Sequence, residues 1–458
     1  MNIQNQTSGS APPKIAVISH AHPSISKGGA EIAAATLFRG LQELKVPAVF
    51  IAAVPWAKRG HLKLGAGEHA VFYDPERYEH FYHLASADVP IQLSRVIEQT
   101  GAQVLNFHHF LNLGLNSVRA ASALPGRCTV MTLHELLSIC HHHGQMLKRP
   151  GLSLCNAASA SSCATCFPEF EWRRFELRYD LFRDVYAGID TFVSPSVFLS
   201  DRTVAWGVPR ERMHVVENGL ANATPEQCTP SAERRKFVFG YFGQINPFKG
   251  VEVILRAAER LGSMVEAEKF EIRLHGNLIG QTDIFREKLE RLSNTLPFLK
   301  FLGPYENEQV SELMGRCDYV VVPSIWWENS PVVIQEAYAV GRPVICTGIG
   351  GMAEKVRDGV SGLHFERGDA ESLLQAMLRA ADVTTHARLQ AGLPRPISAA
   401  DMAREYLKVF DRIDVLSPGL EAEAVGLNVP KPITQTGAPK QQNVPGEQAA
   451  KIRKKAGY

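Results

Sequence analysis

Short apolar runs alternate with glycine turns and amphipathic stretches through most of the chain. In the first half, the run Lys14–His20 leads into Gly28–Glu31, helical spacing follows over 30–44, and a second run occupies 48–54. Apolar runs of this length are typical of strands buried on both faces, which occur in parallel sheets. Because parallel strands need a crossover connection, the pattern predicts β-α-β units with glycines at the strand-to-helix turns, where such sheets bind ligands.

The second half repeats this alternation with its own glycine turns, Gly243–Gly250 and Gly348–Glu354. A chain of 458 residues can hold two separate cores. The sequence therefore predicts an α/β fold of two Rossmann-like domains facing across a cleft. We expect disorder over 1–13, a first domain over 14–225 with an insertion at 138–168, a linker near 221–235, a second domain over 236–395, a C-terminal helix over 396–416 and a disordered tail over 417–458. Further strands are expected at 104–108, 128–133, 191–194, 237–242, 271–275, 300–302, 319–322 and 343–346, and another strand is expected to end in the turn 215–219.

The stretch Pro323–Glu336 holds the densest group of candidate binding residues. Ser330 precedes Pro331, as expected for the N-cap and first residue of a helix. The free amides and the positive dipole end at a helix start bind anions. Since carboxylates repel phosphate, we expect Glu328 and Glu336 to accept hydrogen bonds from hydroxyl groups instead. Phosphate together with a polyol is the chemistry of a sugar nucleotide.

Several motifs occur together in one order along the chain. They are Gly28-Gly29-Ala30-Glu31, His134 after a predicted strand, Ser194-Pro195-Ser196, Asn218-Gly219, Lys249-Gly250, Glu328 with Glu336, and Gly350-Gly351. Over roughly 14–413 the chain resembles the retaining sugar-nucleotide glycosyltransferases of family 4, which have the GT-B architecture, here with a cysteine-rich insertion. The resemblance implies transfer of a hexose-type sugar from a nucleotide-diphosphate donor to a saccharide or lipid-linked saccharide, in surface polysaccharide or glycolipid biosynthesis. It implies no metal or other cofactor for the chemistry.

The resemblance also implies residue roles. Lys249 would neutralise the diphosphate leaving group, Glu328 would contact sugar hydroxyls, and His134 would stabilise an oxocarbenium-like transition state or bind a sugar hydroxyl; these are the expected catalytic residues. Gln244 stands where the family often has arginine, which leaves most of the diphosphate contact to Lys249 and the helix start. The expected donor-binding residues are Gly28, Gly29, Gln244, Lys249, Asn329, Ser330, Pro331, Val332 and Glu336, the last on the ribose.

Local alternatives remain at two of these motifs. The Gly28-Gly29 turn is equally explained by backbone angles that need glycine. His134 on its own is compatible with a structural histidine, although its place at a strand end favours the cleft.

Four cysteines gather within the insertion: Cys140, Cys155, Cys163 and Cys166. The last two form a C-x2-C pair, and four thiols in this arrangement are compatible with a structural zinc site. Unligated thiols are the alternative, and an iron–sulfur cluster is less favoured. Cys128, Cys228, Cys317 and Cys346 are interpreted as ordinary apolar residues.

Composition limits the other partners. The net charge of +2 gives no electrostatic reason to expect nucleic acid as a partner. No apolar run approaches the roughly 20 residues that span a bilayer, and the polar N-terminus lacks a signal-peptide pattern, so we expect a cytoplasmic protein. The basic run 451–455 is compatible with a peripheral contact at the inner face of the membrane, or with a merely solvated tail.

Two other functions fit the same fold. A non-catalytic sugar-nucleotide sensor is one, and the neutral Gln244 keeps it open. A sugar-nucleotide epimerase or phosphorylase is the other. A glycogen-type phosphorylase would need a lysine for pyridoxal phosphate and a longer chain, and neither is evident.

Overall fold

The structure, a computed structural model, describes residues 14–26, 28–221 and 236–412. The expectations for 1–13, the linker, the tail with its basic run, and Cys228 fall outside the described residues.

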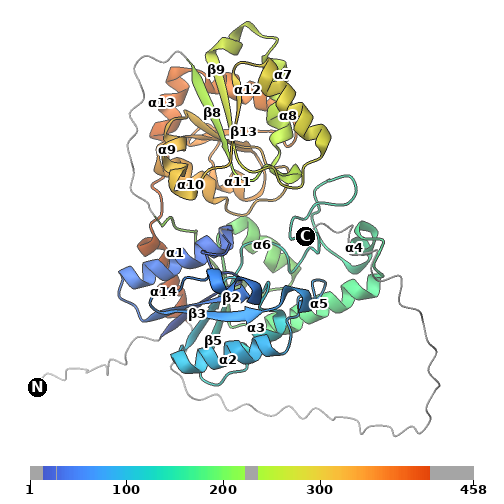
Figure 1. The fold of residues 1–458 in the computed structure, drawn as a ribbon, viewed down its shortest axis with the longest axis vertical. Coiled ribbons are helices and arrows are strands. Elements are labelled where there is room, and N and C mark those ends of the chain that lie inside the picture. The colour runs from blue at the N-terminus through green and yellow to red at the C-terminus, as the bar shows by residue number, and fades with distance from the viewer. Residues whose placement is uncertain (1–13, 27, 222–235, 413–458) are drawn as a thin grey trace, which may run out of the picture. The chain divides into compact units, whose positions relative to one another are not determined.

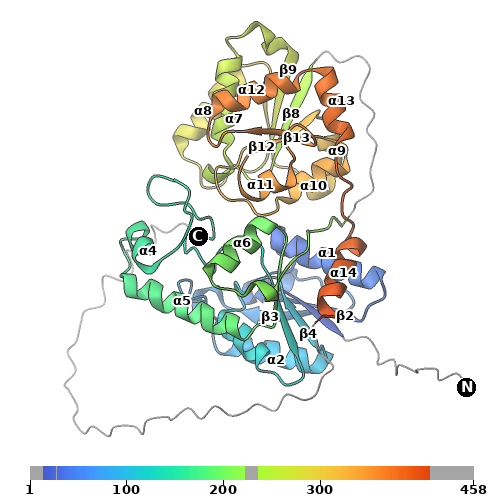
Figure 2. The same cartoon turned by 180° about the vertical axis from the view of Figure 1, so that it is seen from behind.

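Seven parallel strands form the first sheet in the order β3-β2-β1-β4-β5-β6-β7. Every residue of β1 is buried because helices cover both faces of the sheet. Helices α2, α3 and α5 pack on one face, and α1 and the last helix, α14 (Ala399–Phe410), pack on the other, as Figures 1 and 2 show. The strands are β1 Ile15–Ser19, β2 Ala48–Pro55, β3 Glu68–Tyr73, β4 Val104–Phe107, β5 Cys128–Thr132, β6 Thr191–Ser194 and β7 Met213–Val215, and the helices are α1 Gly29–Glu43, α2 Asp88–Thr100, α3 Leu115–Ser122, α4 Ala160–Cys166, α5 Trp172–Ala187 and α6 Val197–Trp206.

Six parallel strands form the second sheet in the order β10-β9-β8-β11-β12-β13. Its two faces are covered by α7, α8 and α12 and by α9, α10 and α11. The strands are β8 Phe237–Phe242, β9 Phe270–His275, β10 Leu299–Gly303, β11 Tyr319–Val322, β12 Val344–Thr347 and β13 Gly362–Phe365, and the helices are α7 Val251–Leu261, α8 Asp283–Thr295, α9 Val310–Gly315, α10 Val332–Ala339, α11 Gly350–Lys355, α12 Ala370–Ala380 and α13 Val383–Ala391.

The predicted fold class is confirmed: two α/β units, each built on a parallel sheet. Both sheets reverse their strand order beside the first strand of the unit, at β1/β4 and at β8/β11. Ligands of open parallel sheets bind at this switch point, beyond the carboxyl ends of the strands. Two strands, β3 and β13, had not been predicted.

The last helix returns to the first sheet. Met402 and Tyr406 of α14 are fully buried in the core that α1 shares. Gly40 of α1 permits this close approach, because a Cβ there would lie 2.0 Å from the carbonyl oxygen of Ala399. The first and the last described elements of the chain, β1 and α14, therefore both belong to the first domain.

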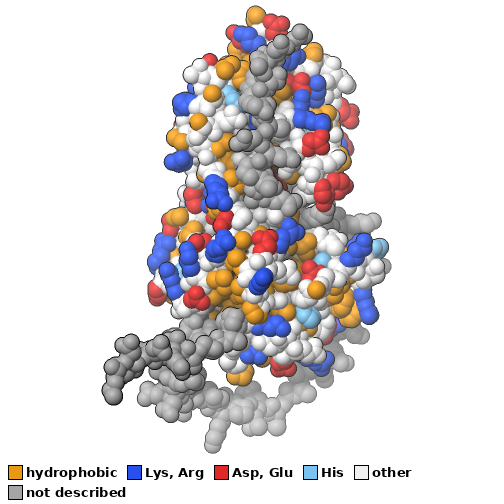
Figure 3. Space-filling model, turned by 90° about the vertical axis from the view of Figure 1, so that its left-hand side faces the viewer, with side chains coloured by type: hydrophobic (Ala, Val, Ile, Leu, Met, Phe, Trp, Pro, Cys, Tyr) orange, Lys and Arg blue, Asp and Glu red, His pale blue; other side chains and the backbone are white. Residues whose placement is uncertain are grey.

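Charges of both signs are interspersed on the face shown in Figure 3. No helix among the described residues combines the length and the apolar character that a membrane span requires.

Candidate active site

A cavity of about 430 Å³ lies at the carboxyl ends of both sheets. Its walls come from the loops that follow β1, β4, β5, β6 and β7 in the first domain and β8 and β11 in the second, together with the start of α1. The cavity therefore occupies the switch points of both sheets. Its lining includes His20, Gly29, Glu31, His109, His134, Glu135, Asn218, Lys249, Trp326, Glu328, Asn329, Ser330, Pro331 and Val332.

Lys249 and Glu328 form an ion pair in this cavity, with 2.6 Å between Lys249 Nζ and Glu328 Oε1. The same oxygen accepts hydrogen bonds from Ser324 Oγ at 2.7 Å and Trp326 Nε1 at 3.0 Å. The Glu328 side chain is 9% exposed and that of Lys249 is 31% exposed. Three donors thus fix one oxygen of the carboxylate, while an ammonium group has further N–H donors for a ligand.

A capped turn after β8 holds Lys249 in place. Asn246 Oδ1 accepts hydrogen bonds from the amides of Phe248 and Lys249, each at 3.0 Å. Gly250 follows with φ of 72°, and a Cβ there would lie 1.9 Å from the carbonyl oxygen of Pro323. Glycine is therefore required where the two loops that carry Lys249 and Glu328 meet.

The second glycine turn supports the Glu328–Asn329 backbone. The amide of Gly351 donates to the carbonyl of Glu328 at 2.8 Å, and a Cβ at Gly351 would lie 1.6 Å from the carbonyl oxygen of Asn329. Asn329 Nδ2 donates to the backbone carbonyl of His134 at 2.8 Å, which joins the two domains at the cavity.

The start of α10 differs from the prediction in one respect. Pro331 is the N-cap and the helix begins at Val332, so Ser330 does not cap it. The hydroxyl of Ser330 instead donates to Glu217 Oε1 of the first domain at 2.5 Å. This bond between the two domains satisfies the hydroxyl that would have capped the helix, and the first amides of α10 are left without an intrahelical partner.

The first domain contributes two carboxylates that had not been predicted as site residues. Glu31 accepts from Ser26 Oγ at 2.6 Å and lies 3.5 Å from His20 Nε2, in the first turn of α1. Glu135 Oε1 lies 3.1 Å from His109 Nε2. His20 directly follows the end of β1, and His109 is the second residue after the end of β4, a strand-end position that could have indicated both.

Several buried polar atoms around the cavity have no hydrogen-bond partner within the described chain. They are His20 Nδ1, Glu135 Oε2, Asn218 Oδ1 and Asn329 Oδ1. Leaving a buried donor or acceptor unpaired costs about 1–3 kcal/mol. These atoms belong to residues that line the cavity, and a ligand that carries several hydroxyl groups would satisfy them where their side chains turn toward it.

Three predicted donor-binding residues do not line the cavity. Gly28 caps α1, and the carboxylate of Glu31 lies beside it. Gln244 is exposed, with its backbone carbonyl bonded to Tyr241 Oη at 2.7 Å. Glu336 lies farther along α10; burial raises the pKa of the Tyr305 phenol, and the charge of Glu336 raises it further.

Burial raises the pKa of Glu336 from 4.5 to about 7. The folded protein therefore keeps this proton up to a higher pH than the unfolded chain does. We expect the free energy of unfolding of the wild type, relative to that of Glu336→Gln, to fall as pH rises from about 4.5 to about 7, by about 3 kcal/mol at most. Denaturant unfolding of both proteins across this range measures the difference. A difference that stays constant with pH would contradict a raised pKa at Glu336.

The predicted zinc site is not supported. Among the described residues, no group of three or more His, Cys, Asp or Glu side chains is placed to hold a metal ion. The thiols have separate partners: Cys163 contacts Tyr179 Oη at 2.8 Å, Cys155 donates to the carbonyl of Ala157 at 3.2 Å, and Cys166 accepts from the amide of Arg149 at 3.1 Å. Burial raises the pKa of Cys140, which favours its neutral thiol. Cys163 and Cys166, which form the C-x2-C pair, both lie in the short helix α4.

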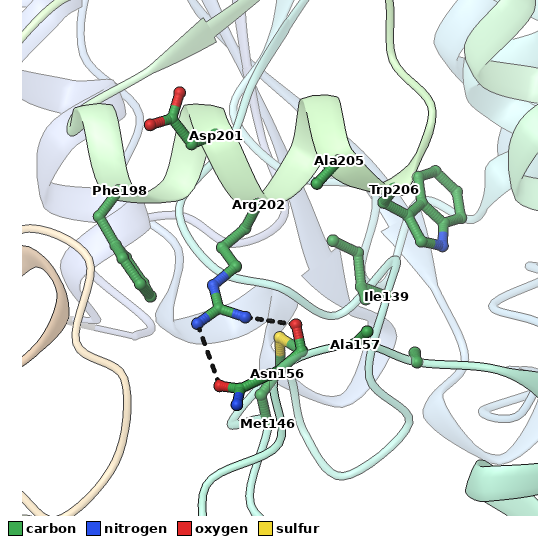
Figure 4. A pocket seen from close by; sticks show the side chains of 10 residues that line it. Ile139, Met146, Asn156, Ala157, Phe198, Asp201, Arg202, Ala205 and Trp206 are labelled. Carbon is green, nitrogen blue, oxygen red and sulfur yellow. Dashed lines mark hydrogen bonds between the residues drawn. The ribbon is translucent and has the colours of Figure 1, made fainter.

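A second cavity, of about 420 Å³, lies between the insertion and α6 (Figure 4). Its lining is largely apolar and includes Ile139, Met146, Phe198 and Trp206. Figure 4 shows Arg202 pointing from α6 to the two oxygens of Asn156.

Trp327 packs against two residues that line the second cavity, Arg202 and Phe198. The guanidinium of Arg202 lies 4.9 Å from the Trp327 ring, which stacks on Phe198 with ring centroids 5.1 Å apart. Trp327 Nε1 also donates to the carbonyl of Cys155 in the insertion at 3.2 Å. Since Trp327 adjoins Glu328, the insertion touches the loop that carries Glu328.

Comparison with known proteins agrees with this geometry. Two parallel-sheet units with a cavity at their facing switch points define a GT-B fold. Residues 27–221 match the family model described as Glycosyltransferase Family 4, and residues 236–382 match that described as Glycosyl transferases group 1. The two halves of the chain are thus similar to glycosyltransferase domains of these two descriptions.

Curated relatives share part of the chain. A D-inositol 3-phosphate glycosyltransferase of Stackebrandtia nassauensis is 32% identical over 184 residues, 37% of this chain and 41% of the relative. A protein of the same name from Rhodococcus opacus is 30% identical over 192 residues, 40% of this chain and 43% of the relative. The chain spans about two fifths of the length of these relatives.

Solved structures share the whole fold. Anabaena HepE in complex with UDP has a TM-score of 0.61 at 16% identity, covering 87% of this chain and 99% of that one. Sucrose-phosphate synthase from Thermosynechococcus elongatus has a TM-score of 0.62 at 16% identity, with the same coverage. At such identities the likeness shows the fold alone.

Proposed function

We propose that this protein is a retaining glycosyltransferase that moves a hexose-type sugar from a nucleotide diphosphate to a saccharide or lipid-linked saccharide, in the biosynthesis of a surface polysaccharide or glycolipid. The observation that carries the proposal is the Lys249–Glu328 pair beside the amino end of α10, in a cavity with unpaired polar atoms. A cation and free amides suit a diphosphate, and the unpaired acceptors suit sugar hydroxyls.

In this proposal the diphosphate lies against Lys249 and the first amides of α10. Negative charge on the diphosphate grows as the glycosidic bond breaks, and a fixed cation lowers the barrier because it stabilises that growing charge. Glu328 holds the ammonium in position through Oε1 and accepts a sugar hydroxyl through its other oxygen. Glu336, farther along the same helix, accepts from the ribose once it is ionised. The positive charge comes from the chain itself, so the proposed chemistry needs no metal ion.

Gly29 provides room on the opposite wall. A Cβ at this position would meet no atom within 4 Å, and Gly29 lines the cavity. We propose that the donor lies over this backbone. The acceptor would approach from the side of the insertion and the second cavity, where aromatic side chains are available for the apolar face of a sugar. Its hydroxyl would attack the face that the diphosphate leaves, with a leaving-group oxygen helping to remove the proton. Exclusion of water between the domains would limit hydrolysis of the donor.

The proposal is tested by a panel of nucleotide sugars, beginning with UDP-sugars because HepE was crystallised with UDP. A donor at 100 times its dissociation constant should stabilise the protein by about 2.7 kcal/mol, which a thermal shift detects. With inositol phosphates and oligosaccharides as acceptors, the product should keep the anomeric configuration of the donor, and a chelator should leave the rate unchanged. Binding without transfer to any acceptor and without hydrolysis would favour a sensor, and inversion would exclude the retaining mechanism.

A further inference from the structure

A buried chain of polar groups runs from the last helix to the cavity. Tyr406 Oη lies 3.1 Å from Thr132 Oγ1, which lies 2.9 Å from Asn106 Oδ1. Asn106 Nδ2 lies 3.4 Å from His108 Nε2, and His108 Nδ1 lies 3.0 Å from His134 Nε2. Apart from His134, which lines the cavity, all members are at most 1% exposed. The chain joins β4, β5 and α14 to the candidate catalytic histidine.

The phenol of Tyr406 sets the direction of these hydrogen bonds. Burial raises the pKa of Tyr406, so the phenol keeps its proton, and Thr132 Oγ1 is its hydrogen-bond partner in the described chain. If Tyr406 donates to Thr132, the Thr132 hydroxyl must donate onward to Asn106 Oδ1. With the opposite amide orientation Thr132 would accept from Asn106, and either the Thr132 or the Tyr406 hydroxyl proton would be left unpaired in the core, which is costly.

This direction assigns the protons of both imidazoles. The amide of Asn106 donates to His108 Nε2, so the neutral His108 ring carries its proton on Nδ1. That proton is donated to His134 Nε2, and the neutral His134 ring must therefore carry its own proton on Nδ1. Burial lowers the pKa of both histidines, which favours neutral rings. The two rings stack at 25° with centroids 5.2 Å apart, so His134 has one orientation.

We infer that His108 is a positioning residue, fixed by the Tyr406–Thr132–Asn106 chain, which makes His134 present an N–H donor to the ligand in the cavity. With respect to the ligand, His134 Nδ1 then donates to a sugar hydroxyl oxygen and does not act as a general base. This ligand assignment rests on the proposed function. The tautomer itself is a property of the free protein.

The tautomer is measured directly in the full-length protein with histidine labelled with ¹⁵N in the ring. Long-range proton–nitrogen spectra distinguish protonated from unprotonated ring nitrogens, and loss of the signal in His134→Gln assigns it. We expect a protonated Nδ1 and an unprotonated Nε2 for His134 in the wild type. A proton on Nε2 overturns the inference whatever the protein transfers.

Two variants test the series of hydrogen bonds from Tyr406 to His134. His108→Phe removes the donor to His134 Nε2, and Tyr406→Phe removes the phenol that orients the amide, so both should give a mixture of His134 tautomers. Tyr319→Phe is the matched control, because it removes a buried phenol bonded to the carbonyl of Ala380 at 2.9 Å in the other domain; His134 should be unchanged. A pure Nδ1–H tautomer in Tyr406→Phe would overturn the role of the chain.

Measurements of sugar transfer distinguish a failure of this inference from a failure of the proposed function. In His108→Phe we expect sugar transfer to slow by about tenfold, which corresponds to the loss of one oriented hydrogen bond. The affinity for UDP should be unchanged, because in the proposed function the His134 ring contacts the sugar and UDP carries none. Absence of sugar-nucleotide binding in a wild type with the expected tautomer would refute the proposed function. An unchanged transfer rate in a variant with mixed tautomers would refute the donor role of His134.

Discussion

Replacing Lys249 with alanine should lower sugar transfer by about 100- to 1,000-fold. The Lys249 ammonium lies 2.6 Å from Glu328 Oε1, and no other lysine or arginine among the described residues lines this cavity. Its removal takes away charge stabilisation that is needed most in the transition state, so kcat should fall more than affinity for the donor. Release of the nucleoside diphosphate, measured with the donor found in the panel, gives the rate.

Lys288→Ala is the matched control for this prediction. Lys288 belongs to the same domain and pairs with Glu252 at 2.9 Å and Glu259 at 3.1 Å, but it does not line the cavity. Its loss should change transfer less than about threefold, since an ion pair of this kind contributes about 0–1 kcal/mol. Equal losses in Lys249→Ala and Lys288→Ala, or an active Lys249→Ala protein, would exclude Lys249 from the reaction.

Replacing Arg178 with methionine should reduce the free energy of unfolding by about 3–5 kcal/mol. The fully buried guanidinium donates to the carbonyls of Phe81 at 3.0 Å and Ser138 at 2.9 Å and also to that of Leu137. Methionine keeps the length of the side chain but leaves three carbonyls without a donor. Urea unfolding measures the loss, which should appear together with greater protease sensitivity at the start of the insertion.

The control for Arg178 is Arg119→Met, which removes an exposed ion pair with Asp184 on the same domain. Exposed pairs contribute about 0–1 kcal/mol, so this variant should unfold near the wild-type midpoint. If both variants lost the same free energy, the three buried hydrogen bonds of Arg178 would not be what stabilises the insertion.

Much of the fold could be predicted because its signal is local. Buried strands such as Tyr319–Val322 are short apolar runs, and glycine turns mark the strand ends, so both depend on neighbours in the sequence. The strand β3 was missed because Glu68 and His69 interrupt its apolar pattern, and β13 because Gly362 and His364 do so.

The candidate site could be predicted in part for the same reason. Side chains at the carboxyl ends of strands meet at one edge of a sheet, which brought His134, Lys249 and Glu328 into one cavity. Glu31 and Glu135 were not predicted as site residues, since their importance comes from the histidines that they face across different loops.

By itself the sequence determined the two parallel sheets and the loops at which a ligand could bind, because hydrophobic periodicity and glycine turns act over a few residues. Only the tertiary structure decided which groups pair across the fold. It turned the hydroxyl of Ser330 toward Glu217, gave the insertion's thiols separate partners in place of a shared metal, and brought Tyr406 within hydrogen-bond distance of Thr132. Each of these outcomes depends on a hydrogen-bond partner supplied by another element of the fold, and spacing along the chain carries no information about such partners.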